Sequence, residues 1–127
     1  MCLSNLTTKK AKTAKEDIVC YKALNTHLFS PYQQYKYELG KKVTIDSPLH
    51  INCMDEIANG FHSFKTLKDA QSELKVWNGV PFKIIDIYFA IIPKGAKYFE
   101  GISSMFDGRY IRKSYTSNEL IVLEKVA

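Results

Sequence analysis

The sequence is poor in the residues that build disulfide frameworks, phosphate loops and metal sites. It has only three cysteines (Cys2, Cys20 and Cys53), and their odd number and wide spacing fit a reducing cytosol better than a disulfide framework. The six glycines are scattered and form no phosphate-binding loop. No CxxC, HxxxH or HExxH spacing occurs, so we expect neither a bound metal nor another cofactor.

Long apolar runs and catalytic motifs are also missing. No run approaches the ~18 residues that a membrane-spanning helix needs, and the first 15 residues lack the hydrophobic core of a signal peptide. We therefore expect no membrane association and a cytoplasmic location. The nucleophile-elbow pattern is absent, and no carboxylate lies close in sequence to His62 to orient it as a general base. The protein is accordingly not expected to be an enzyme.

Basic charge is concentrated at the N-terminus. The chain carries 18 basic and 13 acidic residues, a formal net charge of +5. Residues 1–15 hold four lysines and no acid and contribute +4, residues 16–93 contribute −1, and residues 94–127 contribute +2. We interpret residues 1–15 as a basic, flexible leader in solvent and residues 16–127 as a single ligand-binding domain. Since the domain itself is nearly neutral, a nucleic-acid polymer is not an expected partner.

The apolar pattern predicts short strands around one helix. Strands are expected at residues 17–24, 61–64, 82–92, 96–100, 109–115 and 119–126, with a bent strand or short hairpin at 35–39 and 42–45. Thr66 is placed to cap a helix at residues 67–75, with Asp69 three residues further on. This order predicts an α+β domain with a mostly antiparallel sheet and one main helix packed on one face.

Two predicted strands contain a side chain that could be reactive, His62 in one and Cys20 in the other. In the strand at 61–64 we expect Phe61 and Phe64 on one face and His62 on the other, where it meets either a cleft or solvent. Cys20 lies inside the first long strand and is expected to be a buried, unreactive thiol.

Arginine is used at one place only. The chain has sixteen lysines but two arginines, Arg109 and Arg112, both in one predicted strand. A guanidinium group binds phosphate bidentately and stacks on aromatic rings, which an ammonium group does less well. The spacing of three puts the two on opposite faces of a strand, so that one is available to a ligand and the other to an interface. A pair of exposed strand arginines would give the same pattern.

Aromatic residues accompany these arginines. Tyr110 lies between them, and Phe82 opens the longest predicted strand. Aromatic rings beside guanidinium groups hold a nucleobase and its phosphates without base-pair readout, although such rings also serve as ordinary core. The candidate ligand-binding residues are Arg109, Arg112, Tyr110, Phe82 and His62.

The order of several short segments resembles that of small phage-encoded proteins. These segments are the lysine-rich leader running into residues 16–22 (EDIVCYK), 30–32 (SPY), 60–64 (GFHSF), 92–98 (IPKGAKY) and 117–122 (SNELIV). Within that group the chain most resembles the first-described Thoeris anti-defence family of phage sponge proteins. The resemblance extends over nearly the whole chain.

The resemblance implies a non-catalytic role inside an infected bacterium. Members of that family bind cyclic ADP-ribose isomers made by bacterial TIR-domain enzymes and sequester them without cleaving them. Some also take up cyclic oligonucleotides at a second site. They work as symmetric homo-oligomers with the ligand at or near a subunit contact. From residue chemistry alone, Arg109 or Arg112 would bind the phosphates here, and Phe82 or Tyr110 the base.

Two other functions stay open on the sequence. One is a protein-binding inhibitor that uses a sheet edge and an aromatic patch on a host protein. The other is an enzyme of the ADP-ribosyltransferase-like class, in which His62, Tyr21 and Glu119 or Glu124 would handle a nicotinamide dinucleotide. No glutamate of the chain lies in a recognisable catalytic context, which argues against the second.

Overall fold

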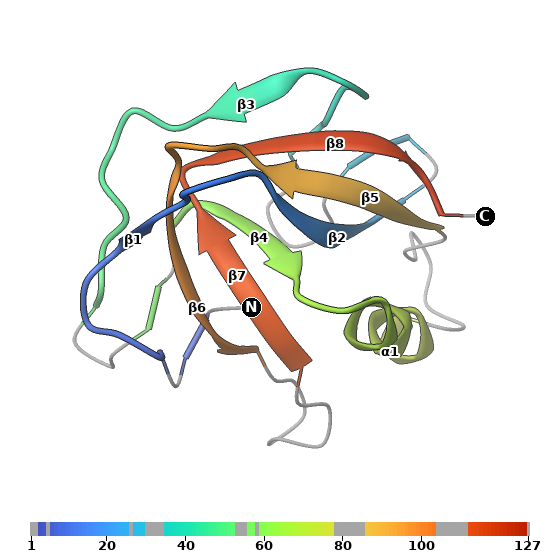
Figure 1. The fold of residues 1–127 in the computed structure, drawn as a ribbon. Coiled ribbons are helices and arrows are strands. Elements are labelled where there is room, and N and C mark those ends of the chain that lie inside the picture. Colours follow the sequence, from blue (N-terminus) through green and yellow to red (C-terminus); the bar gives the residue numbers. More distant parts are fainter. Residues whose placement is uncertain are drawn as a thin grey trace.

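One antiparallel sheet and one helix make up the fold of the residues that the structure describes. The computed structural model describes residues 3–4, 6–25, 27–29, 35–52, 56–57, 59–77, 86–103 and 112–126. Its elements are, in chain order, β1 (Lys12–Thr13), β2 (Ile18–Leu24), β3 (Lys42–Thr44), β4 (Phe61–Phe64), α1 (Leu67–Trp77), β5 (Asp86–Ile92), β6 (Lys97–Ser103), β7 (Arg112–Ser117) and β8 (Glu119–Lys125). Within these residues the strands pair antiparallel in the order β1-β6-β7-β4-β2-β5-β8-β3 (Figure 1). The predicted α+β class is confirmed.

The largest apolar cluster covers one face of the sheet, which we call the core face. Side chains alternate between the two faces along each strand, so one residue in two points into this cluster. The register joins Cys20 of β2 to Ala90 of β5, and Ala90 in turn to Val122 of β8. All three are completely buried. Phe61 of β4 and Tyr115 of β7 extend the same cluster across the sheet.

Helix α1 covers part of the opposite face, which we call the helix face. Ala70 of the helix is completely buried against Ala23, Phe64 and Ile87 of the sheet. Figure 1 shows α1 beside the ends of β4 and β7. The predicted cap of the helix is confirmed.

Two hydrogen bonds between Thr66 and Asp69 form this cap at the first turn of α1. The Asp69 backbone N–H donates to the Thr66 hydroxyl oxygen at 3.1 Å, and the hydroxyl donates to the Asp69 carboxylate at 2.5 Å. The first helical N–H groups lack partners within the helix, so this reciprocal arrangement satisfies one of them and fixes where the helix begins.

The N-terminal segment is part of the sheet, and the expectation of a solvated leader is wrong for its described residues. Its backbone runs along the outer edge of β6. Ser4 exchanges hydrogen bonds with Ile102 at 2.8 and 2.7 Å, β1 pairs with Tyr98 and Lys97, and the Ala14 N–H donates to the Ala96 carbonyl at 2.9 Å. An unpaired strand edge offers backbone donors and acceptors that any extended segment can satisfy, whatever its side chains.

Apolar contacts also hold this segment. Leu3 is completely buried with Ile57 and Phe99, and Leu6 packs against the same cluster. Gly101 of β6 makes the approach possible: a Cβ there would overlap the carbonyl oxygen of Ser4 and lie 3.3 Å from Leu3. The two leucines are the sequence signal that marks this segment as folded.

Two further expectations about strands need correction. Residues 35–39 form neither a strand nor half of a hairpin, because Lys36 makes only an isolated bridge to Phe29. Strand β6 extends to Ser103, beyond the predicted end at residue 100, because each residue from Tyr98 to Ser103 finds a partner in β7.

Candidate functional site

Two of the five sequence-predicted site residues lie on the helix face. His62 is the second residue of β4, and Arg112 is the first residue of β7, the strand that pairs with β4. The other three candidates, Phe82, Arg109 and Tyr110, lie outside the described residues. The fold therefore brings together two predicted residues that are 50 positions apart in the chain.

Phe64 is the residue that connects them. The His62 ring meets the Phe64 ring edge to face, with centroids 4.9 Å apart, and the Arg112 guanidinium carbon lies 5.7 Å from the same ring. The expectation that Phe61 and Phe64 share a face, with His62 opposite, is wrong. A spacing of three residues puts the two phenylalanines on opposite faces, so Phe61 joins the core face and His62 shares the helix face with Phe64.

This cluster is buried. Arg112 has no exposed surface, and the nearby hydroxyls of Ser103 and Ser114 lie 2.7 Å apart in the interior. The Nε2 atom of His62 is buried, and no described residue hydrogen-bonds to it. Burial lowers the pKa of His62 well below its ordinary value, and the positive charges of Lys22 and Arg112 lower it further. His62 is thus a neutral imidazole whose Nε2 atom lies in the interior.

A buried lysine on the core face was missed by the sequence analysis. The Lys22 ammonium donates to the backbone carbonyl of His62 and lies 5.4 Å from the centre of the Tyr37 ring. Burial, with a smaller effect of Tyr35, raises the pKa of Tyr37, so its phenol stays neutral. The alternation of β2 already placed Lys22 on the same side as Cys20, which is the signal that it points inward.

The expectation for Cys20 is confirmed. Its thiol is completely buried, and burial raises its pKa to about 11. A thiol is a poor nucleophile while it stays protonated, and at neutral pH this one does. Cys2 and Cys53 lie outside the described residues.

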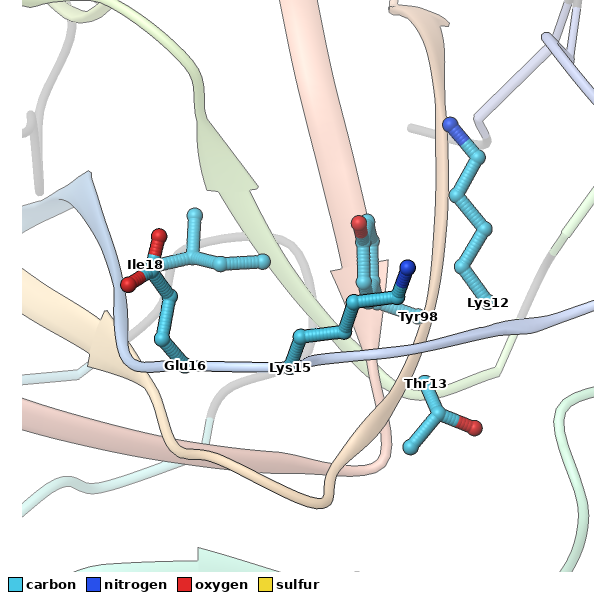
Figure 2. A pocket seen from close by; sticks show the side chains of 6 residues that line it. All are labelled: Lys12, Thr13, Lys15, Glu16, Ile18 and Tyr98. Carbon is cyan, nitrogen blue, oxygen red and sulfur yellow. The ribbon is translucent and has the colours of Figure 1, made fainter.

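A hollow opens where the N-terminal segment crosses from β1 to β2. Its volume is about 560 Å³, and it is lined by Lys12, Thr13, Lys15, Glu16, Ile18 and Tyr98. Figure 2 shows Lys15, Ile18 and Tyr98 directed toward the same space, with Lys12 alongside Tyr98. Three lining residues precede residue 16, so the segment expected to be a free leader forms one wall.

Charge and an aromatic ring meet in this hollow. The Lys12 ammonium lies 6.0 Å from the centre of the Tyr98 ring and 3.9 Å from the Glu100 carboxylate. Lys65 also binds Glu100, at 2.7 Å, so this carboxylate is shared between two lysines. The Tyr98 ring is held in turn by an edge contact with Tyr115, centroids 5.8 Å apart.

The wall that carries the lysines is fixed by its backbone. The Gly95 N–H donates to the Ala14 carbonyl at 2.8 Å, and the Lys94 N–H donates to the Asp17 carboxylate at 2.9 Å. The hollow thus combines the ammonium groups of Lys12 and Lys15, the Glu16 carboxylate, the Tyr98 ring and the apolar Ile18 side chain. Its two cations and its ring suit an anion that carries a flat apolar body. The sequence analysis missed the hollow because it treated the lysines as solvated.

The structure adds two findings on metals and membranes. Among the described residues, no group of three or more histidine, cysteine, aspartate or glutamate side chains comes together as a metal site. In the same part of the chain, no helix has the length and apolar character that crossing a bilayer requires.

Comparison with family models, with curated proteins and with solved structures finds no match. The candidate function is therefore argued from the site itself and from the resemblance described above.

Proposed function

We propose that this protein binds a small phosphorylated nucleotide in the hollow and holds it without chemical change. The observation that supports this best is the placement of two ammonium groups, Lys12 and Lys15, around the Tyr98 ring (Figure 2). Ammonium groups attract phosphate as point charges, and an aromatic ring offers a stacking surface to a base of any kind. A hollow of about 560 Å³ is within the usual size range of small-molecule sites.

The resemblance names the ligand class for this proposal. A cyclic ADP-ribose isomer contains a pyrophosphate and an adenine, which are the two groups that the hollow suits. In this proposal the protein acts in the cytoplasm of an infected bacterium, where it sequesters the signal of a TIR-domain enzyme. Tight sequestration needs a site that is already ordered, and the backbone hydrogen bonds of Ala14 and Lys94 supply that order.

A homo-oligomer is part of the same proposal. On the helix face, beyond the part that packs against α1, a row of apolar residues crosses three strands: Val19 pairs with Ile91, and Ile91 with Ile121. Val19 is 58% exposed, and Leu123 on the same strand as Ile121 is 37% exposed. Exposed apolar side chains on one face of a sheet mark an interaction site in many proteins, and we assign this row to a second copy of the chain.

The same row supports the second candidate function, an inhibitor that docks on a host protein. The two candidates differ in what occupies the apolar row, and only the first requires a nucleotide in the hollow. The enzyme candidate differs from both because it consumes its ligand.

One experiment separates binding from turnover. The purified protein is mixed with cyclic ADP-ribose isomers, freed of unbound ligand by gel filtration, and heated to release what it holds. Chromatography with mass detection should recover the intact cyclic ligand. Recovery of a cleaved product would contradict sequestration and favour the enzyme. A protein that retains no ligand at all would favour the protein-binding inhibitor.

A further inference from the structure

We propose that the Glu16 carboxylate makes the hollow selective for a ribonucleotide, because it accepts hydrogen bonds from the 2′- and 3′-hydroxyls of the ribose. Glu16 lines the hollow together with the lysines and Tyr98. The lysines account for the phosphates of the proposed ligand and the ring for its base, but neither accounts for the sugar. The inference deepens the proposed function and rests on it, since it assigns the remaining part of the same nucleotide.

The backbone on either side of Glu16 is held in place. Two positions before it, both backbone groups of Ala14 are hydrogen-bonded to residues 95–96, in the turn before β6, at 2.8 and 2.9 Å. The residue after it, Asp17, accepts the Lys94 N–H at 2.9 Å through its carboxylate. Glu16 therefore starts from a fixed point of the wall, and a ligand does not have to order the chain that carries it.

The carboxylate of Glu16 is available, in contrast to those of two other acidic residues beside the hollow. Glu100 is bound by Lys12 and Lys65, at 3.9 and 2.7 Å, and Asp17 accepts a backbone N–H. The Glu16 side chain is exposed and forms no ion pair or hydrogen bond with any residue that the structure describes. Its oxygens can therefore accept hydrogen bonds from a ligand.

Lys15 and Glu16 are consecutive and carry opposite charges, but they form no ion pair with each other. Figure 2 shows Lys15 reaching toward Tyr98 and Glu16 toward Ile18, whose side chain lies between the two charged groups in this view. Ile18 also packs against the core. The hollow thus has a cationic side and an anionic side. A phosphate is attracted to the first and repelled by the second, so a bound nucleotide should turn its phosphates toward Lys15 and neutral donors toward Glu16.

The ribose diol is the donor of a nucleotide that suits this carboxylate. Its two vicinal hydroxyls can both donate to one carboxylate, and an acidic side chain binds the ribose 2′-hydroxyl in dinucleotide-binding folds. The amino group of adenine is the other donor, but the proposed function places the base on Tyr98, toward which Lys15 and not Glu16 reaches (Figure 2). Because Glu16 is exposed and water competes for it, we expect a selectivity of about 10-fold (1.4 kcal/mol), far below that of a buried site.

The test compares nucleotides of equal charge on the intact protein. Calorimetry measures binding of ADP, of 2′-deoxy-ADP, which lacks one sugar hydroxyl, and of IDP, in which a carbonyl replaces the amino group of adenine. The proteins are the wild type, Glu16→Ala, Lys15→Gln and the matched control Glu124→Ala, which removes an exposed glutamate of β8. Since the ligands carry the same charge, general electrostatic attraction cancels in the ratio of their affinities.

We expect the wild type to bind ADP and IDP about 10-fold more tightly than 2′-deoxy-ADP. Glu16→Ala should reduce this ratio to less than about 2-fold by weakening ADP while leaving 2′-deoxy-ADP no weaker. Glu124→Ala should keep the wild-type ratio. Lys15→Gln should weaken all three nucleotides alike, because it acts on the phosphates that they share.

A ratio that persists in Glu16→Ala, or a loss of affinity for IDP in place of 2′-deoxy-ADP, would show that Glu16 does not bind the diol and would overturn the inference. If ADP and 2′-deoxy-ADP bind equally well to the wild type and Lys15→Gln weakens both, the inference fails and the proposed function stands. If no nucleotide binds, both fail.

Discussion

At the scale of single residues, His62 makes the fold sensitive to acid. Its imidazole is neutral because it is buried and close to the positive charges of Lys22 and Arg112. The folded pKa therefore lies below that of the unfolded chain, which takes up the proton first as the pH falls. The stability that this neutral group contributes is complete above about pH 6.5 and is lost as the pH decreases below it.

The corresponding prediction concerns unfolding by urea at pH 7 and pH 5. Neutral burial of His62 should account for up to about 2 kcal/mol of the loss in unfolding free energy between these pH values. His62→Gln should show a correspondingly shallower pH dependence, and His27→Gln, which changes an exposed histidine, should behave like the wild type. A His62→Gln protein with the wild-type pH dependence would contradict this account.

Arg112 carries a second prediction at this scale. Its guanidinium is completely buried over the Phe64 ring, so replacing it removes a large interior side chain together with its charge contacts. Arg112→Ala should lower the free energy of unfolding by about 3 kcal/mol. The neighbouring Lys113→Ala, at an exposed position of β7, should change it by less than about 0.5 kcal/mol. If urea unfolding shows equally small losses of unfolding free energy for the two variants, Arg112 does not stabilise the interior.

At the scale of elements, the docked N-terminal segment distinguishes this fold from the one that the sequence predicts. Gly101 leaves room for it, since a Cβ would overlap the Ser4 carbonyl. Gly101→Ala should therefore displace residues 3, 4, 6 and 7 from β6 and raise their hydrogen exchange to that of unpaired backbone.

The control for this prediction is Gly40→Ala. Gly40 has a φ of +79° and open space around it, so alanine there strains only its own turn. In the Gly40→Ala variant, the hydrogen exchange of residues 3, 4, 6 and 7 should match that of the wild type. Wild-type exchange in Gly101→Ala as well would mean that the segment does not depend on close approach to β6.

Most elements could be predicted because local pattern decides them. The β-branched and aromatic residues of β2, β5 and β8 favour strands, and Thr66 with Asp69 marks the start of α1. The docking of β1 could not be predicted, because β1 has no apolar alternation and pairs through its backbone. Pairing with a strand about 85 positions away produces no pattern in the local sequence. The only sequence signal for docking of this segment is the pair of apolar residues Leu3 and Leu6.

At the scale of the whole molecule, the uncovered part of the helix face predicts self-association. Val19, Ile91 and Ile121 form an apolar row across three strands. Next to Ile121 the row meets Lys42, which forms an ion pair with Glu119 at 3.4 Å, so the end of the row carries one positive and one negative side chain. Val19→Lys should shift the protein toward the monomer in light scattering, whereas Gln71→Lys on the exposed side of α1 should not. A wild-type protein that is monomeric at high concentration would contradict this assignment.

The site shows the same division between local pattern and long-range pairing. Arginine usage and the GFHSF segment singled out Arg112 and His62, which do lie on one face, but their shared contact with the Phe64 ring depends on the pairing of β4 with β7. The hollow is made by two segments, residues 12–18 and Tyr98 of β6, which meet only in the folded chain, so no spacing in the sequence predicts it.

Calorimetric titration of cyclic ADP-ribose isomers into the wild type and two variants tests the central claim most directly. Lys12→Gln/Lys15→Gln removes both ammonium groups of the hollow, and Arg109→Ala removes one of the two arginines that the sequence analysis named for the phosphates. The account predicts tight binding to the wild type, a loss of at least about 10-fold (1.4 kcal/mol) in the lysine variant, and unchanged binding in Arg109→Ala. Loss of binding in Arg109→Ala alone, with the lysine variant unaffected, would show that binding does not depend on the two lysines of the hollow and would contradict it.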